Sequence, residues 1–194
     1  MFANMAIDKH PGAITYISKA HPKFNELAEK AVKIRQDYFE YIPSTHPKYD
    51  ELAEMAIKSE PKNIRYISIE YSNYNELAKI AIYKQPYVFK YVPLDCSIYE
   101  ELAEIAIEYN YSLISYIPVD HSVFLKLAKK AVKENSYSIK QINFDCVFAK
   151  CQKNKEFNEF MKMILRKYGS ILRHVPEDYS CYCSFAKIAY KCIS

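Results

Sequence analysis

Hydrophobic and small residues recur along this chain every 25 positions. Within each unit they fall first at positions i, i+3, i+4, i+7 and i+8, which is the spacing of a helix with one buried face. One unit carries them as Tyr99, Leu102, Ala103, Ala106 and Ile107. The pattern predicts a first helix of ~10–13 residues in each unit.

A second, shorter apolar cluster follows the first helix after a turn. In the same unit it comprises Leu113, Ile114, Tyr116 and Ile117, and its spacing fits about two turns, or ~6–8 residues, of helix. Prolines recur directly after it, where they would end the helix, at Pro43, Pro93, Pro118 and Pro176. Each unit is therefore predicted to be a helix, a tight turn, a short helix and a connector. The period-2 alternation of a half-buried strand is absent.

Eight copies of the unit can be aligned on one position of the first helix. These anchors are Ala3, Ala28, Ala53, Ala78, Ala103, Ala128, Met161 and Ala186. A fixed period of this length is typical of a solenoid, in which each unit packs mainly on its neighbours. We therefore predict an all-α fold, a right-handed α-solenoid of about eight helix-turn-helix repeats that forms one domain over residues 1–194.

Small side chains occupy two columns of the first helix, a column being the same position in successive units. They are Ala28, Ala53, Ala78, Ala103 and Ala128, and Ala31, Ala56, Ala81, Ala106 and Ala131. Such residues let successive helices approach closely, so a larger side chain there would overpack the stack at a cost of ~1–3 kcal/mol.

The period slips once, because the step from Ala128 to Met161 is 33 positions instead of 25. About eight extra residues therefore lie near 146–156, between Asp145 and Phe157. They are expected to lengthen a connector or to add a turn of helix. Two interpretations remain open, an insertion tolerated on the edge of the solenoid, and a bend or contact loop.

The unit resembles a class of short tandem helical repeats of unknown function found in viral and bacterial proteins. The motif combines E-L-A-x-x-A-V/I with a later Y-I/V-P, and EELAEIAIEYNYSLISYIP at 100–118 matches it best. The resemblance extends over the chain except for its ends and the extra residues. It implies a fold and no activity, so it supplies no catalytic residues.

Composition argues against several other classes of protein. Only two glycines occur, so glycine-rich phosphate loops are excluded, and the sequence contains none of the common hydrolase, P-loop or dinucleotide motifs. We therefore predict that the protein is not an enzyme and holds no cofactor. No apolar run approaches the ~18–20 residues that span a bilayer, and the N-terminus does not read as a signal peptide. A cytoplasmic location, or a host cytosol or nucleus, is expected, with reduced cysteines.

The most suggestive column for binding consists of tyrosines in the second cluster. Its members are Tyr16, Tyr41, Tyr66, Tyr91 and Tyr116. A ladder of such rings could grip an extended peptide or stack on the bases of a single strand. Alternatively, each ring packs between units as a structural wedge, with its hydroxyl at the surface. The structural interpretation is favoured because every helical repeat needs an inter-unit wedge.

Charge is segregated along the chain. Residues 95–120 carry six acidic residues and no Lys or Arg, whereas residues 126–173 carry twelve Lys and Arg against four acidic residues, a net charge of +8. The basic candidates are Lys126, Lys129, Lys130, Lys133, Lys162, Arg166 and Lys167. They could bind nucleic acid or an acidic protein, or pair with the acidic stretch of another copy, or form a solvated face.

Histidine or cysteine occupies most positions of a connector column, at His21, His46, Cys96, His121 and Cys146. Members of successive units lie too far apart to share one ion, because zinc ligands lie only ~2.0–2.3 Å from the metal. The cysteines near the C-terminus, Cys181, Cys183 and Cys192, follow no recognised zinc-finger spacing. No metal site is predicted.

Together these features favour a non-enzymatic scaffold for protein–protein interaction, such as a viral or effector-type inhibitor or adaptor. The alternative is a nucleic-acid-binding solenoid that uses the basic segment 126–173. Self-association is a further expectation, through the opposite charges or through the apolar C-terminal end.

Overall fold

The computed structural model describes residues 2–151 and 153–193, and over these ranges it contains nine α-helices, seven 3₁₀ helices and no strand. The prediction of an all-α repeat solenoid is confirmed, since α-helices of mostly 11 residues alternate with 3₁₀ helices of six residues. Residues 1–105 and 106–194 form two compact units, which are described in turn. The handedness of the solenoid and its being one domain stay predictions.

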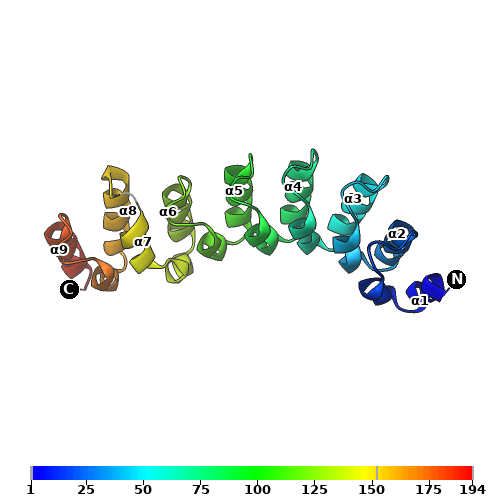
Figure 1. Cartoon of the computed structure of the whole chain (residues 1–194). Helices are drawn as coiled ribbons and strands as arrows, with labels where there is room; N and C mark the ends of the chain where they lie inside the picture. The colour runs from blue at the N-terminus through cyan, green and yellow to red at the C-terminus, as the bar shows by residue number, and fades with distance from the viewer. Residues whose placement is uncertain (1, 152, 194) are drawn as a thin grey trace. The chain divides into compact units, whose positions relative to one another are not determined.

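The first unit contains four complete pairs of helices and the start of a fifth. Its elements are α1 (Phe2–Lys9), η1 (Pro11–Tyr16), α2 (Phe24–Ile34), η2 (Gln36–Tyr41), α3 (Tyr49–Ser59), η3 (Pro61–Tyr66), α4 (Tyr74–Lys84), η4 (Pro86–Tyr91) and the beginning of α5 (Tyr99–Tyr109). Successive α-helices pack on one another in one layer, and successive 3₁₀ helices pack in a second layer (Figure 1).

The second unit begins within α5 and repeats the same arrangement with one addition. Its elements are η5 (Tyr111–Tyr116), α6 (Phe124–Glu134), η6 (Ser136–Gln141), α7 (Phe144–Lys150), α8 (Lys155–Leu165), η7 (Gly169–His174) and α9 (Tyr182–Ile193). Helices α6, α8 and α9 pack in sequence, so the α-layer continues past α7.

The core follows the columns predicted from the sequence. Both alanine columns are fully buried, each side chain being 0% exposed, and the column of Leu27, Leu52, Leu77, Leu102 and Leu127 is at most 5% exposed. The small side chains leave room for neighbouring α-helices, and the buried leucines add apolar surface to the core. A larger residue in the alanine columns would therefore have to displace the adjacent helix.

The second element of each repeat is a 3₁₀ helix, which the sequence pattern did not distinguish from an α-helix. Six residues at three per turn make two turns, which agrees with the predicted length. Proline begins three of these helices, at Pro11, Pro61 and Pro86. An asparagine caps the start of two others, η5 and η6, since the side chains of Asn110 and Asn135 accept the backbone N–H of the residue two positions later, each at 2.9 Å.

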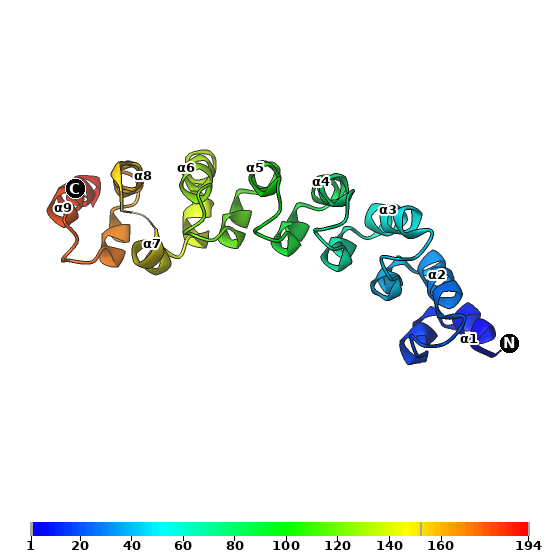
Figure 2. The same ribbon diagram turned by 45° about the horizontal axis from the view of Figure 1, so that its top comes forward.

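The extra residues near 146–156 form most of α7 and the loop after it. Phe144, Val147 and Phe148 of this helix are at most 4% exposed, and the Phe148 ring meets the Phe157 ring edge-on at 5.3 Å. The segment therefore adds helix, which was one of the two expected outcomes. It is part of the core, however, and not an insertion on the edge of the solenoid. It lies in the 3₁₀ layer, between η6 and η7 (Figure 2).

A cluster of ion pairs around Glu29 joins the second and third repeats of the first unit. Glu29 on α2 accepts hydrogen bonds from the ammonium groups of Lys33 and Lys48, both at 2.7 Å. His46 is buried beside it, with Nε2 lying 3.7 Å from the carboxylate. Because Lys48 directly precedes α3, the Glu29 carboxylate fixes the start of one repeat against the helix of another.

Candidate interaction surfaces

The tyrosine column ends each 3₁₀ helix of the first unit and lies at the surface. The wedge between repeats is formed instead by the residue two positions earlier, at Ile14, Phe39, Ile64 and Phe89, each at most 1% exposed. Tyr41, Tyr66 and Tyr91 are half-buried, whereas Tyr16 is 93% exposed. In the second unit Tyr116 is 40% exposed. The inter-unit wedge that the sequence required is thus present, but in the neighbouring column.

Arginine links two consecutive rings of this column. The Arg65 guanidinium carbon lies 4.5 Å from the ring centroid of Tyr66 and 5.7 Å from that of Tyr91. The Lys90 ammonium lies 5.0 Å from the same Tyr91 ring. Cation–π contacts of this kind hold the rings in place. The result is a continuous surface of two aromatic rings and two cations across adjacent repeats, and we call it the Tyr–Arg surface (Arg65, Tyr66, Lys90 and Tyr91).

The basic candidates of residues 126–173 do not form one open patch. Lys129 pairs with Glu156 at 3.0 Å, Lys130 with Glu108 at 2.5 Å, and Lys162 with Glu159 at 2.9 Å. The ammonium of Lys167 lies over the Tyr168 ring at 5.6 Å. Lys126, Lys133 and Arg166 are exposed on α6 and after α8. Much of the positive charge counted in the sequence is therefore matched by a carboxylate close by.

The acidic stretch is also partly matched within its own units. Glu101 lies 2.9 Å from Lys79 in the first unit, and Glu108 pairs with Lys130 in the second. Pairing of opposite charges between two copies of the chain would have to compete with these contacts. Self-association stays a prediction.

The histidine and cysteine column has a local role in the connectors. The Nδ1 atoms of His21, His46 and His121 accept the backbone N–H of the residue two positions later, at 3.1, 3.1 and 3.2 Å respectively. Cys96 receives the corresponding N–H from Ile98, and burial raises the pKa of its thiol. Each side chain thus shapes the turn before the next α-helix, which the sequence analysis did not foresee. Within residues 2–151 and 153–193, no three His, Cys, Asp or Glu side chains are grouped as a metal site.

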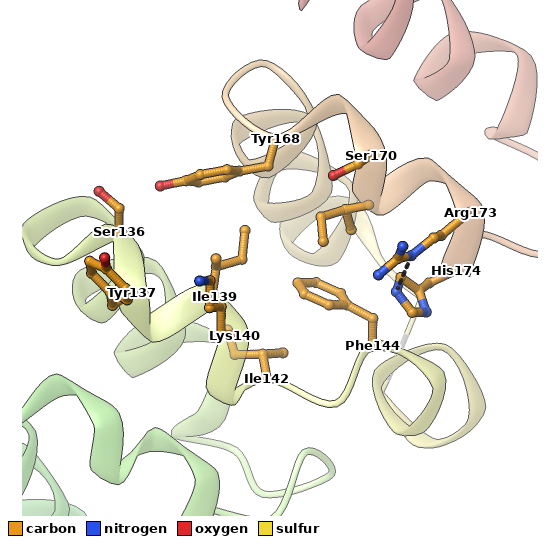
Figure 3. A pocket seen from close by; sticks show the side chains of 11 residues that line it. Ser136, Tyr137, Ile139, Lys140, Ile142, Phe144, Tyr168, Ser170, Arg173 and His174 are labelled. Atoms are coloured by element: carbon orange, nitrogen blue, oxygen red, sulfur yellow. Dashed lines mark hydrogen bonds between the residues drawn. The ribbon is translucent and has the colours of Figure 1, made fainter.

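A groove of about 570 Å³ lies in the second unit, lined by residues of η6, the start of α7 and the Tyr168–η7 segment (Figure 3). Its lining comprises Ser136, Tyr137, Ile139, Lys140, Ile142, Phe144, Tyr168, Ser170, Ile171, Arg173 and His174. We call it the α7 groove. Ile139, Ile142 and Phe144 are at most 7% exposed and give it an apolar floor.

One end of the α7 groove carries a chain of polar contacts. Arg173 Nε donates to Nε2 of His174 at 3.1 Å (Figure 3). Nδ1 of His174 lies 2.9 Å from Oδ1 of Asp145. Because Nε2 accepts a hydrogen bond, the proton of the neutral ring is on Nδ1 and is donated to Asp145. The His174 ring also lies 5.9 Å from the ring of Phe144. These contacts fix the guanidinium of Arg173 at the groove.

The residues of the α7 groove were not predicted from the sequence. Lys140 and Phe144 are separated from Arg173 by about thirty positions, and no motif connects them. The slip in the period was the available signal, because it marked the place where the regular packing of 3₁₀ helices had to change.

The fold and these surfaces define a helical-repeat protein. A model of a domain of unknown function (DUF4116) matches residues 49–96, which run from the start of α3 past η4 and include the Tyr–Arg surface. Neither the curated proteins nor the solved structures contain a match to the chain. In the part of the chain that the structure describes, no helix has the length and apolar character needed to cross a bilayer.

Proposed function

We propose that this chain is a non-enzymatic helical-repeat module that binds another protein through the Tyr–Arg surface. The observation that carries the proposal is the position of the Arg65 guanidinium, which contacts the rings of both Tyr66 and Tyr91. Tyrosine and arginine are among the residues that contribute most to binding energy at protein interfaces. Here they stand at the surface of two adjacent repeats instead of filling the core.

The arrangement also lowers the cost of binding. Ordering a long side chain at an interface costs roughly 0.5–1.5 kcal/mol. The contacts with both tyrosine rings restrain Arg65 before any partner arrives, and Arg65 Nη2 donates to the Tyr66 hydroxyl at 2.5 Å. A partner would thus meet half-buried rings and a cation that are already in place.

A nucleic-acid-binding role is less well supported. Affinity for a nucleic acid depends on cations that neutralise phosphates. Among the basic candidates, Lys129, Lys130 and Lys162 are already paired with glutamates. A protein partner is therefore favoured over a strand of RNA or DNA bound by the basic segment.

Affinity capture with matched variants tests the proposal. Proteins retained by the wild type would be compared with those retained by the Tyr66→Ala/Tyr91→Ala variant and by Tyr83→Ala, which removes a 55% exposed tyrosine of α4 outside the column. We expect a partner that is retained by the wild type and Tyr83→Ala and lost from the double variant, with unchanged circular dichroism. If every retained protein is indifferent to the double variant, the proposal fails.

A gel-shift measurement at low salt tests the alternative. A labelled single-stranded oligonucleotide that binds the wild type, and no longer binds the Arg166→Glu/Lys167→Glu variant, would replace the proposed function with nucleic-acid binding.

A further inference from the structure

The α7 groove exists because one extra helix was added to only one of the two layers. In the preceding repeats of the second unit, η5 packs directly against η6. After η6, helix α7 lies before η7 in the same layer, while α6 and α8 remain in contact in the other layer (Figure 2). The two 3₁₀ helices that line the groove are therefore set apart at this point, and their apolar residues line an open space.

The charged side chains in the described lining of the groove are those of Lys140 and Arg173, and both are basic. The carboxylate of Asp145 lies just outside the lining, where it contacts Nδ1 of His174 at 2.9 Å. The floor of Ile139, Ile142 and Phe144 is apolar, and the hydroxyl groups of Ser136, Tyr137 and Ser170 lie around it. Such a site suits a ligand that combines a large apolar group with a negative charge.

We infer that the α7 groove binds a short acidic segment of a partner protein, with an aromatic or aliphatic side chain on the floor and an adjacent carboxylate on Arg173 and Lys140. This inference rests on the proposed function in that the partner is a protein, but it uses a different surface from the Tyr–Arg surface.

Charge complementarity supports this occupant. The described lining contains the basic side chains of Lys140 and Arg173 and no Asp or Glu, and the nearby carboxylate of Asp145 is already in contact with His174. Arg173 is already oriented through His174 and Asp145. An arginine held in this way can bind a carboxylate with two parallel hydrogen bonds.

The size and surroundings fit a peptide better than a nucleic-acid strand. A volume of about 570 Å³ falls within the range of roughly 300–1,000 Å³ typical of ligand sites and holds a large side chain with its neighbouring peptide groups. Tyr137 is 70% exposed and extends the surface beyond the groove, where flanking residues of a segment would lie. Two cations are few for the successive phosphates of a strand.

Selection from a random peptide library tests the inference. Phage-displayed peptides would be selected on the full chain, and a synthetic copy of the most enriched peptide would be titrated by fluorescence anisotropy. We expect enriched peptides in which Asp or Glu flanks Phe, Leu or Ile. Because a charge-assisted pair is lost, Arg173→Glu should weaken binding at least about tenfold, and Lys140→Glu should weaken it less.

Matched variants separate the groove from general effects of charge and folding. Lys133→Glu removes an exposed lysine of the same unit outside the lining and should change binding less than about twofold at 150 mM salt. Arg173→Gln keeps the size of the side chain and should still lose most of the affinity, with an unchanged thermal transition. Tyr66→Ala/Tyr91→Ala should bind the peptide normally.

Several results would overturn the inference. These are a failure to enrich any peptide, enrichment without acidic residues, binding that is unchanged by Arg173→Glu, and an oligonucleotide that competes for the groove. A partner that still depends on Tyr66 and Tyr91 would leave the proposed function standing while the groove inference fails.

Discussion

The carboxylate of Glu29 gives a quantitative test of how one repeat is fixed to the next. Hydrogen bonds from Lys33 and then Lys48 hold the pKa of Glu29 at about 2. An ordinary glutamate has a pKa of about 4.3, and one pKa unit corresponds to about 1.36 kcal/mol. The full difference would contribute about 3 kcal/mol to the free energy of unfolding. Both lysine side chains are about half exposed, at 45% and 51%, so solvent screening reduces the expected contribution to about 1 kcal/mol.

The sign of the pH dependence follows from the lowered pKa. A carboxyl group whose pKa is lower in the folded state stabilises the fold fully above its unfolded pKa, near pH 4.3. The stabilisation is lost as the pH falls from there toward about 2, where Glu29 becomes protonated in the folded state as well. Glu29→Gln should therefore cost about 1 kcal/mol at pH 7 and almost nothing near pH 2.

Urea denaturation of the wild type and Glu29→Gln between pH 7 and pH 2.5 would measure this difference. Glu54→Gln is the matched control, because Glu54 pairs with Lys58 on the exposed face of α3, and among the described residues it forms no ion pair with another repeat. Its cost should be a few tenths of a kcal/mol, roughly that of an exposed i,i+4 pair. The reasoning is refuted if the effect of Glu29→Gln does not change with pH, or if it equals that of Glu54→Gln at pH 7.

Three further predictions address the core and the thiols. Tyr74→Phe should stabilise the protein by up to about 1 kcal/mol in thermal denaturation, because the Tyr74 hydroxyl is buried without a hydrogen-bond partner among the described residues. Tyr71→Phe should instead destabilise the protein, because it removes the hydrogen bond from the Tyr71 hydroxyl to Asp50. A loss of stability in Tyr74→Phe would contradict this reasoning. Ala78→Leu should cost ~1–3 kcal/mol in urea denaturation, since the site is 0% exposed between packed helices, and a neutral effect would show that the stack can expand. Exposed Cys183 should react with a thiol reagent in the native protein and buried Cys96 only after unfolding, as mass spectrometry of labelled peptides would show, and equal rates would contradict the burial of Cys96.

The repeat pattern predicted much of the fold because each column has one physical role. Positions such as Ala53, Ala56 and Leu52 are buried in the copies from α2 to α6 and in α8, so spacing alone identified the face and length of the first helix. The second element was harder, because six residues with apolar positions close together fit either two turns of 3₁₀ helix or a short α-helix. Proline or asparagine at the start does not decide the helix type either, because η2 and η7 have neither and are also six-residue 3₁₀ helices.

The candidate sites were predicted less completely. The tyrosine column was visible in the sequence, but the contact of one guanidinium with both Tyr66 and Tyr91 depends on the distance between repeats. The basic segment looked open because a charge count does not show that Lys129 lies beside Glu156, which is 27 positions away. The α7 groove depends on which layer receives the extra residues, and their hydrophobic pattern alone does not decide this.

The placement of α7 also bears on how such arrays can diversify. Since α6 and α8 stay in contact, a segment of helix was accommodated without breaking the stack that holds the repeats together. The α-layer then maintains the stability of the stack, whereas the 3₁₀ layer accepts the change. A repeat can gain a cavity in this second layer while the neighbouring α-helices keep their interfaces. The connector after η6 is accordingly a natural site for grafting other short helices, each of which would reshape one groove and leave the rest of the array intact.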